Sequence, residues 1–541
     1  PCKTFTVMRP NGPDYPVGFK TDAEKYRGNI QMEKSEGAVL SKFLALLDRN
    51  DPDVLIGHRL DDVDYTLLLS RMRECRTPGW HRIGRLKRHE WPKNIGKGGG
   101  SFFVERQLAA GRLLCDLGND MGKSLMTKCQ SWSLDEMCDL VLGGENKRRD
   151  IDNDVLLKMA TNRAGLMQYI KLTEADTFFI AAIALKVQML PLTKVLTNLA
   201  GNSWARTLSG TRAERNEYIL LHEFHKNKYI CPDKIWGKGK AKSDEDNPEG
   251  DEGADAKKKD KFKGGLVFEP EKGLYDKFIL VMDFNSLYPS IIQEYNICFT
   301  TVERSETVSY SRLDPQTRLT HFQNEDEEKV PEVPADTNNK GILPRLIRTL
   351  VHRRREVKKL MKDKSATSDQ LATWEIKQMA LKLTANSMYG CLGYTKSRFY
   401  ARPLAMLTTY KGREILQSTK DLAESAHGLR VIYGDTDSVM VNTNVDNIMD
   451  AMKIGNDFKK SVNERYELLE IDIDNIFRRL LLHAKKKYAA VNMIEKDGKW
   501  IDKLEVKGLD MRRREYCALS KDTSTELLNF LLSGEDPETV V

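Results

Sequence analysis

The sequence predicts a multidomain protein of the α/β (α+β) class, and three observations support this prediction. The chain has 541 residues, which is too long for one ordinary domain, so two to four domains are expected. Strand-like apolar runs alternate with longer runs of helical periodicity. No run of about 18 apolar residues occurs and the first residues lack a signal-peptide pattern, so we expect neither a membrane-spanning helix nor a signal peptide.

The cysteines indicate the cellular compartment, and the two chain ends indicate whether the sequence is a fragment. The nine cysteines are scattered without a CxxC pair, which favours reduced thiols in a cytosolic or nuclear protein over disulfides or a zinc site. The sequence starts without Met and stops in EDPETVV without a clear closing element. We therefore expect a fragment of a longer protein.

Residues 1–195 are expected to form a first α/β domain. The segments DVLIGH (53–58) and GRLLCDL (111–117) are typical of buried strands. The segments GAVLSKFLALLDR (37–49) and YTLLLSRMREC (65–75) have helical periodicity instead. Strands and helices of this length in alternation indicate a sheet covered by helices.

Two polar stretches are predicted to be loops. Residues 236–262 are charged, Gly-rich and almost free of apolar side chains, which predicts a disordered insertion near 238–262. Residues 313–340 include NEDEEKVPEVPADTNNK and are predicted to form a second loop.

Basic residues are unevenly distributed along the chain. The formal net charge is only +7, which says little about binding partners. Eleven basic and four acidic residues lie between 341 and 391, and twelve basic and five acidic residues lie between 478 and 514. Such clusters suit a polyanion whose counterions are released on binding, although a solvated protein face is the simpler interpretation.

Two acidic residues close together are candidates for a metal site. The segment VIYGDTDSVMV (431–441) places Asp435 and Asp437 one residue apart in a run that otherwise resembles a buried strand. A hairpin turn is one interpretation, because Gly434, Asp435 and Thr436 are turn formers between apolar flanks. The alternative is a divalent metal site, where a cation removes the repulsion between the carboxylates. That alternative requires a third carboxylate.

Asp283 is the candidate for the third carboxylate. The segment FILVMDF (278–284) is typical of a buried strand that ends in this acid, and SLYPSII (286–292) turns into a helix whose N-terminal amides suit anionic oxygens. An ordinary helix N-cap is the simpler interpretation of Asp283 taken alone. Three carboxylates on adjacent strand ends can hold two Mg²⁺ ions about 3.5 to 4 Å apart, the arrangement used for in-line phosphoryl displacement.

Two helices that carry phosphate-binding side chains are predicted at 344–364 and 368–391. The candidates are Arg354 and Lys358 on one face of the first, and Lys382, Asn386 and Tyr389 on one stripe of the second. An ordinary solvated helix explains the first pair as well as a function does. It explains the second set poorly, because Asn is unfavourable at mid-helix and a cation, an amide and an aromatic ring together suit a phosphate and a base. The three cations could neutralise a triphosphate.

Lysines near the end of the chain are candidates for a DNA-backbone surface. AKKKYAAV (484–491) places three lysines before a Tyr in a strand-like run, and EVKGLDMRRREY (505–516) follows. Solvated lysines of an edge strand are the simpler interpretation. A surface that follows a DNA backbone, with the Tyr as an aromatic contact, is the alternative.

Taken in order, these segments resemble the conserved motifs of family B DNA polymerases. DFNSLYPSII (283–292) resembles motif A, KLTANSMYG (382–390) motif B and YGDTDS (433–438) motif C, and KKKY (485–488) follows at the family's position. The similarity covers nearly the whole chain. Within the family, SLYPSIIQEYNICFTT and LTANSMYGCLGY most resemble the alpha-type replicative branch, whose members extend RNA primers made by primase.

The resemblance implies a right-hand polymerase with palm and fingers, an exonuclease-like α/β domain and a truncated thumb. The implied domains are an inactive, N-terminally truncated exonuclease-like domain at 1–195, a first part of the palm at 196–340, fingers of two antiparallel helices at 341–391, a second part of the palm at 392–504, and the start of the thumb at 505–541.

The resemblance also implies roles for individual residues. The implied metal ligands are Asp283, Phe284, Asp435 and Asp437, and the three acids are the implied catalytic residues. The implied nucleotide-binding residues are Ser286, Leu287, Tyr288, Arg354, Lys358, Lys382, Asn386 and Tyr389, with Tyr288 under the sugar as a gate against a 2′-hydroxyl. The implied DNA-binding residues are Gly434, Thr436, Lys485, Lys486, Lys487, Tyr488, Lys507 and Gly508.

The first 195 residues resemble the family's 3′-5′ exonuclease domain but depart from its motifs. The second motif, roughly GxNxxxFD, becomes GHRLDDVD (57–64), with Arg59 in place of Asn and Val63 in place of Phe, and it keeps Asp64. The third, YxxxD, becomes LTEAD, with Leu172 in place of Tyr before Asp176. We therefore expect an exonuclease fold without activity.

Two further departures concern a missing acid pair and a template contact. The only early candidate for the nuclease's Asp-x-Glu pair is Asp22 with Glu24, which lies in a polar stretch too near the second motif. FKGG (262–265) has Phe262 where the family usually has Tyr, which puts one template hydrogen bond in doubt.

The expected function is DNA-directed DNA synthesis by two-metal nucleotidyl transfer, extending RNA or DNA primers in replication initiation without proofreading. The expected cofactor is a pair of Mg²⁺ ions, with Mn²⁺ as a substitute. Expected partners are primer-template DNA, RNA-primed DNA and deoxynucleoside triphosphates, with primase subunits and the polymerase B subunit for the full-length protein, no membrane, and a nuclear location. A proofreading delta-type polymerase and a catalytically dead nucleic-acid scaffold are the alternatives.

Overall fold

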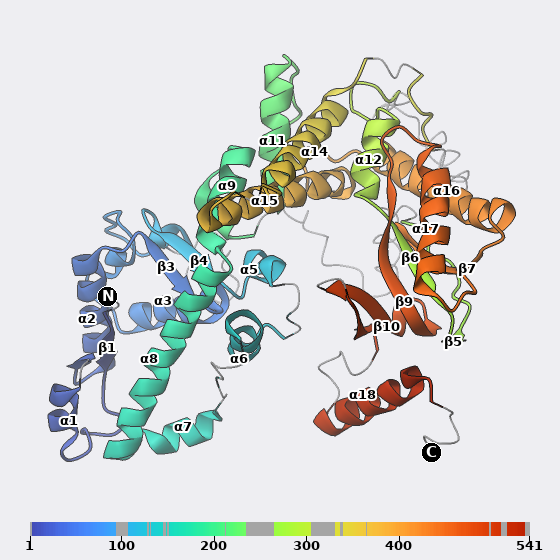
Figure 1. The fold of residues 1–541 in the computed structure, drawn as a ribbon. Coiled ribbons are helices and arrows are strands. Elements are labelled where there is room, and N and C mark those ends of the chain that lie inside the picture. The colour runs from blue at the N-terminus through green and yellow to red at the C-terminus, as the bar shows by residue number, and fades with distance from the viewer. Residues whose placement is uncertain are drawn as a thin grey trace, which may run out of the picture. The chain divides into compact units, whose positions relative to one another are not determined.

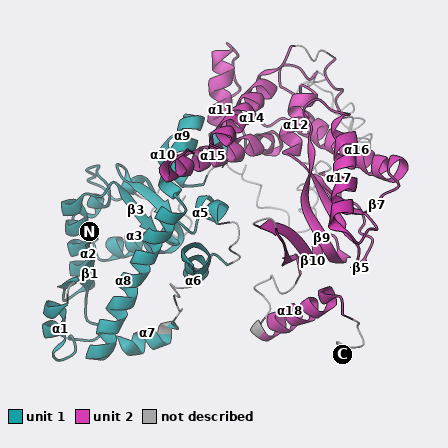
Figure 2. Cartoon of the chain, viewed as in Figure 1, with its two compact units in different colours: residues 1–215 teal, residues 216–541 magenta. Residues whose placement is uncertain are grey.

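The computed structural model divides the chain into two compact units, residues 1–215 and residues 216–541 (Figure 2). It describes residues 3–26, 28–92, 106–126, 129, 131–143, 148, 151–210, 212–233, 264–303, 330–335, 339–363, 365–496, 499–509 and 517–535. The insertion predicted near 238–262 lies outside these residues, as do Phe262 and most of the loop predicted at 313–340.

Unit 1 contains two small parallel sheets, each covered by helices (Figure 1). The strands are β1 (Phe5–Met8) paired with β2 (Asn29–Met32), and β3 (Val54–Gly57) paired with β4 (Leu113–Asp116). The helices are α1 (Phe19–Lys25), α2 (Glu36–Asn50), α3 (Tyr65–Glu74), α5 (Asp120–Leu125), α6 (Leu134–Met137), α7 (Asn153–Met159), α8 (Arg163–Lys186), α9 (Met189–Ala200) and α10 (Trp204–Leu208). The strands and helices predicted for 37–117 are therefore confirmed.

The core of unit 1 follows from the periodicity of its helices. Leu40, Leu44 and Leu47 recur at helical spacing on one face of α2 and are buried with Leu69 and Met72 of α3. The helix α2 starts where the Ser35 side chain accepts the Ala38 N–H, an ordinary N-cap. These contacts fix the position of the loop that follows β3, where the exonuclease-like motif lies.

Unit 2 is built on an antiparallel sheet in the order β11-β10-β9-β6-β8-β7, with β5 pairing β9. Its strands are β5 (Gly273–Tyr275), β6 (Ile279–Phe284), β7 (Arg430–Asp435), β8 (Ser438–Asn442), β9 (Ile471–Ala484), β10 (Lys487–Lys496) and β11 (Lys499–Lys507). The strand β6 is central and almost wholly buried, as its apolar run predicts. It pairs with β8 on one side and β9 on the other.

Some helices of unit 2 pack on this sheet and others extend away from it (Figure 1). They are α11 (Arg212–Lys226), which begins in unit 1, then α12 (Leu287–Glu294), α14 (Ile342–Leu360), α15 (Ser368–Gly393), α16 (Arg402–Ala426), α17 (Ile448–Asn463) and α18 (Ala518–Ser533). The predicted pair at 344–364 and 368–391 is confirmed as α14 and α15, which pack on each other. A capping box between Thr367 and Gln370 starts α15.

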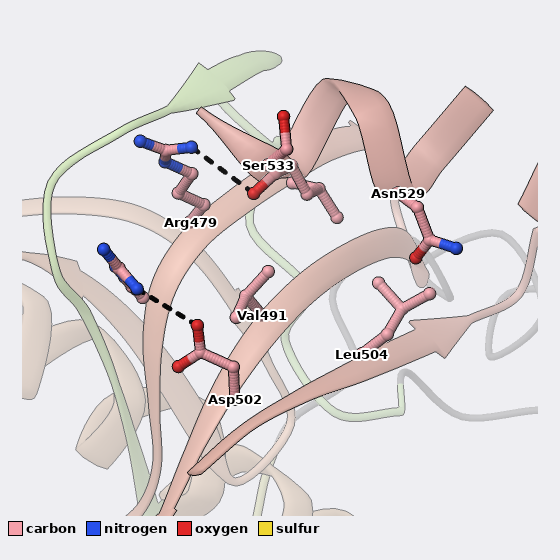
Figure 3. A pocket seen from close by; sticks show the side chains of 8 residues that line it. Arg479, Val491, Asp502, Leu504, Asn529 and Ser533 are labelled. Carbon is pink, nitrogen blue, oxygen red and sulfur yellow. Dashed lines mark hydrogen bonds and ion pairs between the residues drawn. The ribbon is translucent and has the colours of Figure 1, made fainter. Parts of the chain in front are cut away.

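The helix α18 packs on the β9–β10 end of the sheet through Leu528 and Leu532, which contact Ala489 and Val506. A small pocket lies beside this contact, where Arg479 reaches the last turn of α18 and donates to the Leu532 carbonyl at 3.4 Å (Figure 3). A cation at a helix C-terminus is favourable because the last carbonyls carry partial negative charge.

Two of the domain limits expected from the sequence fall inside elements. Residue 195 lies within α9, whereas the two units divide after residue 215. Residue 504 lies within β11, which continues to Lys507. Among the described helices, none is alone long and apolar enough to cross a membrane, and only the bent pair α8 and α9 reaches that length and composition.

Candidate active site

Strand pairing brings the three predicted acids of unit 2 together. Asp283, at the end of β6, lies opposite Ser438 in the β6–β8 ladder, and Asp435, at the end of β7, lies opposite the same Ser438. The Phe284 N–H donates to the Asp437 carbonyl at 2.8 Å, which fixes the β7–β8 turn against the end of β6. Acids that are distant in the chain therefore share one edge of the sheet. The sheet's register is the cause.

The β7–β8 segment is a hairpin as well as an acid cluster. Thr436 and Asp437 form the turn, and Thr436 has a positive φ of 60°. The hairpin interpretation of the sequence is thus right about local structure, and it does not exclude the metal-site interpretation. Asp283 is not an N-cap, because Ser286 occupies that position of α12 and its side chain makes no capping bond.

Burial and repulsion destabilise the charged forms of two of these acids. Burial raises the pKa of Asp283 to about 7, and the neighbouring charges of Asp437 and Asp474 act in the same direction, whereas Lys507 opposes them. Burial also raises the pKa of Asp437, with Asp435 contributing. Within the described residues, no hydrogen bond or ion pair joins the Asp283 side chain to a partner. The nearby lysines, Lys507 for Asp283 and Lys486 for Asp437, only partly offset the cost of burying these two carboxylates.

Asp435 differs from the other two acids because a lysine neutralises it. The Lys486 ammonium lies 3.0 Å from the Asp435 carboxylate, and this hydrogen bond is the main cause of the raised pKa of Lys486. Lys486 belongs to the turn between β9 and β10 and has a φ of 60°. The Tyr433 hydroxyl accepts the Lys486 N–H at 2.9 Å, which holds the turn beside the acids.

The acids line a groove of about 460 Å³. The residues around it are Val281, Asp283, Tyr433, Asp435, Thr436, Asp437, Ser438, Met440, Asp474, Asn475, Lys486, Tyr488 and Lys507. Carboxylate and carbonyl oxygens are the donors that Mg²⁺ and Mn²⁺ prefer, so the donor set fits such ions. In the described part of the chain, no three His, Cys, Asp or Glu side chains already surround one point. The acids would have to adjust their rotamers around an ion.

Tyr288 lies at the start of α12, directly after the strand-end acid. Its ring stacks on that of Tyr389 of α15, with ring centroids 4.4 Å apart and planes 24° apart. Two glycines leave room for it: a Cβ added at Gly412 would lie 3.3 Å from Tyr288 Cε1, and one at Gly265 would lie 3.1 Å from the Tyr288 hydroxyl oxygen. Tyr288 is therefore enclosed on several sides and has little freedom to move.

The other predicted residues of α12 support Tyr288. Ser286 adopts the left-handed region with a φ of 52°, which makes the sharp turn from β6 into α12. Leu287 is buried at 3% exposure and packs toward Gly412, and the Phe284 side chain is buried at 1%. Any metal contact of Phe284 would thus use its backbone carbonyl.

The helices α14 and α15 bring the predicted cations together. The charges of Arg354 and Lys382 help lower the pKa of Lys358, with Arg354 the largest cause, so the three groups lie close enough to repel one another. Burial lowers the pKa of Arg354, whose Nε donates to Gln378 at 3.4 Å. Lys382 and Asn386 are exposed on the same stripe of α15 as Tyr389. A cluster of repelling cations is a favourable place for a polyanion.

The residues predicted to bind DNA lie near the same groove but differ in exposure. Lys485 and Lys486 form the β9–β10 turn, so they are turn residues and not edge-strand lysines as the simpler interpretation had it. Tyr488 is only 6% exposed, and the Lys507 ammonium lies 5.6 Å above its ring. Gly434 is buried, and an added Cβ there would lie 2.5 Å from Phe268. Tyr488 and Gly434 support the groove wall more than they face solvent.

Gly508 has a positive φ of 66°, and a Cβ there would lie 2.1 Å from the Lys486 carbonyl. Glycine is therefore required for the close approach of β11 to the turn formed by Lys485 and Lys486, called here the lysine turn. Lys487 begins β10 and is half-buried, and Lys507 is exposed at the end of β11. The lysine turn and the end of β11 form one continuous basic surface beside the acids.

The sequence-based reasoning missed several residues of the site. Asp474 of β9 lines the groove and raises the Asp283 pKa, and Arg413 of α16 donates to the Gly264 carbonyl at 2.9 Å beside the Tyr288 pocket. The alternation IDID in β9 places Asp472 and Asp474 on one face, which was a usable signal. Gly412 and Arg413 carried no comparable signal, because their role depends on how α16 packs on α12.

Unit 1 also contains buried acids, but these have partners within the protein. Asp61 is 3% exposed and accepts from the Arg106 guanidinium, with Arg106 Nε at 3.0 Å from its carboxylate. Asp116 is 1% exposed and accepts the Gly118 N–H at 2.8 Å and the Asp61 N–H at 3.1 Å. Asp64, the acid that the degenerate motif keeps, is half-buried, and burial raises its pKa.

The remaining nuclease candidates of unit 1 form ordinary ion pairs. Asp176 on α8 accepts from Arg148 at 2.7 and 3.0 Å, and Asp22 on α1 pairs with Arg163. Leu172 lies one turn before Asp176 on α8. The structure therefore does not bring Asp22 or Asp176 to the Asp61 and Asp116 cluster by any contact among the described residues.

Comparison with known proteins agrees with this geometry. The family model described as DNA polymerase family B matches residues 202–541, and the model described as DNA polymerase family B, exonuclease domain, matches residues 3–137. The DNA polymerase alpha catalytic subunit of Saccharomyces cerevisiae is 50% identical over 99% of this chain and 36% of its own length. Those of Mus musculus and Arabidopsis thaliana are 44% and 41% identical, each over 99% of this chain and 36% of their length. The chain thus spans about a third of the curated relatives it matches.

Proposed function

This chain belongs to DNA polymerase family B, and we propose that it is the polymerising part of an alpha-type replicative enzyme that extends RNA and DNA primers with deoxynucleoside triphosphates. The observation that carries the proposal is the shared edge of Asp283, Asp435 and Asp437. The cation cluster of α14 and α15 supports it. A polymerase needs little covalent chemistry from the protein. It needs positioning and charge neutralisation.

The three acids would hold the metal ions. Two Mg²⁺ ions, when bound, would activate the attacking 3′-hydroxyl and stabilise the leaving oxygen. Asp283 and Asp437 would hold them, with Asp435 and the Phe284 carbonyl beside them. Burial and neighbouring acids raise the pKa of Asp283 and Asp437, so binding of a divalent cation would displace protons from this site.

The helices α14 and α15 would bind and neutralise the triphosphate. Arg354, Lys358 and Lys382 would contact the triphosphate, with Asn386 on the same stripe, and their mutual repulsion is relieved when an anion binds. Ser286 and Leu287 shape the turn beneath the nucleotide. The stacked rings of Tyr288 and Tyr389 would form the floor under its sugar and the nascent base pair.

Tyr288 would act as the gate against ribonucleotides because its enclosed ring leaves no room for a 2′-hydroxyl. Replacing Tyr288 with Ala should raise ribonucleotide incorporation by about 10- to 100-fold relative to deoxyribonucleotide incorporation, the range expected when a close steric contact is removed. Competitive incorporation on one template measures the ratio. Unchanged sugar discrimination would refute the gate.

The basic surface at Lys485, Lys486, Lys487 and Lys507 would follow the primer duplex through its phosphates, with Gly434, Thr436, Tyr488 and Gly508 shaping that surface. Such contacts position the duplex without reading its sequence. Binding should therefore weaken steeply with salt.

Primer extension with Mg²⁺, comparing RNA-primed and DNA-primed templates, tests the proposal directly. Extension of both primers is the expected result, and no extension of either by a protein that binds the duplex would overturn it. That last outcome would instead favour a nucleic-acid scaffold. Retained buried acids argue against a scaffold, since uncompensated charges serve no purpose there.

Proofreading is the second point to test. We propose that unit 1 has an exonuclease fold without activity, because Arg59 replaces the motif's Asn and the neighbouring Asp61 is bound to Arg106. Incubation with a 5′-labelled single strand and Mg²⁺ should leave it intact. Stepwise 3′-5′ shortening would favour the delta-type alternative.

Assembly with primase and polymerase B subunits in the nucleus belongs to the proposal for the full-length protein.

A further inference from the structure

The helix α11 holds α15 at a point next to the proposed nucleotide site. Asn216 of α11 is only 2% exposed. Its amide nitrogen donates to the Ser387 carbonyl at 2.8 Å, and its amide oxygen accepts from the Ser387 hydroxyl at 2.9 Å. Both ends of one buried side chain thus bind one residue of α15. Such a pairing is directional, because rotating or sliding α15 would break both bonds.

This contact lies on the opposite side of α15 from the proposed site. Ser387 and Tyr389 are two residues apart, so they project about 200° apart around the helix. Tyr389 faces Tyr288, with their ring centroids 4.4 Å apart. The helix α15 therefore contacts Asn216 on one side and Tyr288 on the other.

A second contact holds the chain just beyond α15. Glu217, the neighbour of Asn216, pairs with Arg398 at 3.0 Å, and the Glu217 side chain is 8% exposed. Between the two contacts lies Gly390, where an added Cβ would meet nothing within 4 Å. Packing thus does not require glycine there, and a glycine in a helix interior weakens it by about 1 kcal/mol. The contacts with α11 therefore add to the packing of α15 on α12, α14 and α16.

We propose that Asn216 is a positioning residue for nucleotide selection: it holds Ser387 so that Tyr389 stays stacked on Tyr288. The inference rests on the proposed function, in which these rings lie under the incoming sugar. Without the Asn216 bonds, α15 can shift away from α12, and the gap between the rings opens. A displacement of a fraction of an ångström at such a site is enough to change selection.

The test compares wild type with Asn216→Ala in primer extension, with deoxyribonucleotides and ribonucleotides measured separately. We expect kcat/KM for ribonucleotides relative to deoxyribonucleotides to rise about 10-fold. We also expect the KM for the correct deoxyribonucleotide to rise more than kcat falls, because the acids are untouched. A purely structural role would lower the amount of active enzyme without moving the sugar ratio.

Asn463→Ala is the matched control. Asn463 of α17 makes a similar pair of bonds, donating to the Ile471 carbonyl at 3.1 Å and accepting the Ile471 N–H at 2.7 Å, but it does not contact α15. This variant should lower thermal stability comparably and leave the sugar ratio unchanged. If Asn216→Ala lowers stability but keeps the wild-type ratio, as the control should, the positioning role is overturned.

A double-mutant cycle gives a second test, because the sugar ratio can still be measured when the variants are less stable. Ser387→Ala removes the hydroxyl contact with Asn216, together with the hydroxyl contact to the Thr384 carbonyl within α15, and keeps the Asn216 bond to the Ser387 carbonyl. It should therefore have a smaller effect on the sugar ratio than Asn216→Ala. The double variant should be no worse than Asn216→Ala alone, whereas fully additive effects would contradict the contact. A wild-type protein that extends no primer would instead refute the proposed function itself, so the two failures are distinguishable.

Discussion

Burial raises the pKa of acids in both units, but the buried acids of the two units differ in their hydrogen-bond partners. In unit 1, Asp61 is bound by the Arg106 guanidinium and Asp116 by two backbone N–H groups. In unit 2, burial raises the pKa of Asp283 and of Asp437, with Asp437 adding to the shift of Asp283 and Asp435 to that of Asp437. Acids whose charge the protein itself neutralises have a structural role. Asp283, whose side chain has no hydrogen bond or ion pair among the described residues, is suited to an external cation.

The contrast supports the proposal that unit 1 has an exonuclease fold without activity. In unit 1, the Arg106 guanidinium is a permanent cation beside the buried Asp61. In unit 2, the neutralising lysine is bound only to Asp435, and Lys486 is two-thirds exposed.

The largest expected effect is on primer extension, which should depend on the acids of unit 2 and not on those of unit 1. Asp437→Asn should reduce primer extension by more than about 1,000-fold, or about 4 kcal/mol of transition-state stabilisation, because one metal ligand is lost. Duplex binding, measured by fluorescence anisotropy, should change little. Asp64→Asn in unit 1 is the control and should extend primers at the wild-type rate. Normal extension by Asp437→Asn would refute the metal assignment.

The next effect concerns stability in unit 1. Arg106→Ala leaves Asp61 buried without its guanidinium, which should cost about 3–5 kcal/mol of the free energy of unfolding. Urea unfolding monitored by circular dichroism measures the loss. Adding Asp61→Asn to Arg106→Ala should recover part of it, since the unpaired charge is then gone. No loss in the single variant would show that Asp61 is already neutral.

A smaller effect is expected from divalent ions. Because an ion that binds only the folded state stabilises it, Mg²⁺ at about 100 times its dissociation constant should add about 2.7 kcal/mol to unit 2. Thermal melts with Mg²⁺ and with EDTA measure the shift. Asp283→Asn should abolish it, whereas Asp61→Asn should leave the shift intact. A shift retained in Asp283→Asn would place the ion elsewhere.

The smallest effect is a difference in pH dependence. The folded-state pKa of Asp283 is raised from 3.8 to about 7, so its contribution to stability is present below pH 4 and is lost as the pH rises through 7. In EDTA, Asp283→Asn should therefore melt higher than wild type at pH 8 but not at pH 4, by about 2–4 °C per kcal/mol gained.

The Asp22–Arg163 pair provides a contrast of opposite sign. Arg163 lowers the pKa of Asp22, so its contribution is present above pH 4 and is lost as the pH falls below that. Asp22→Asn should therefore melt lower than wild type at neutral pH and equal to it in acid. Identical pH profiles for the two variants would contradict the assigned pKa shifts.

Local patterns were enough to predict most elements and the identity of the candidate acids. The apolar run of β6, the two basic helices and the helices of unit 1 follow from periodicity, which depends on which side chains face the core. The lysine turn was less predictable. Three consecutive lysines resemble an edge strand, and only the pairing of β9 with β10 shows that two of them form the turn.

The sequence by itself determined which residues could carry charge, bind phosphate or end a strand, because those properties belong to side chains and their local spacing. Only the tertiary structure decided which charges meet. The β6–β8 register placed Asp283 beside Asp437, the packing of α16 made Gly412 a wall of the Tyr288 pocket, and α11 brought Asn216 to Ser387. Such meetings depend on contacts between residues that are distant in the chain, and no local pattern encodes them.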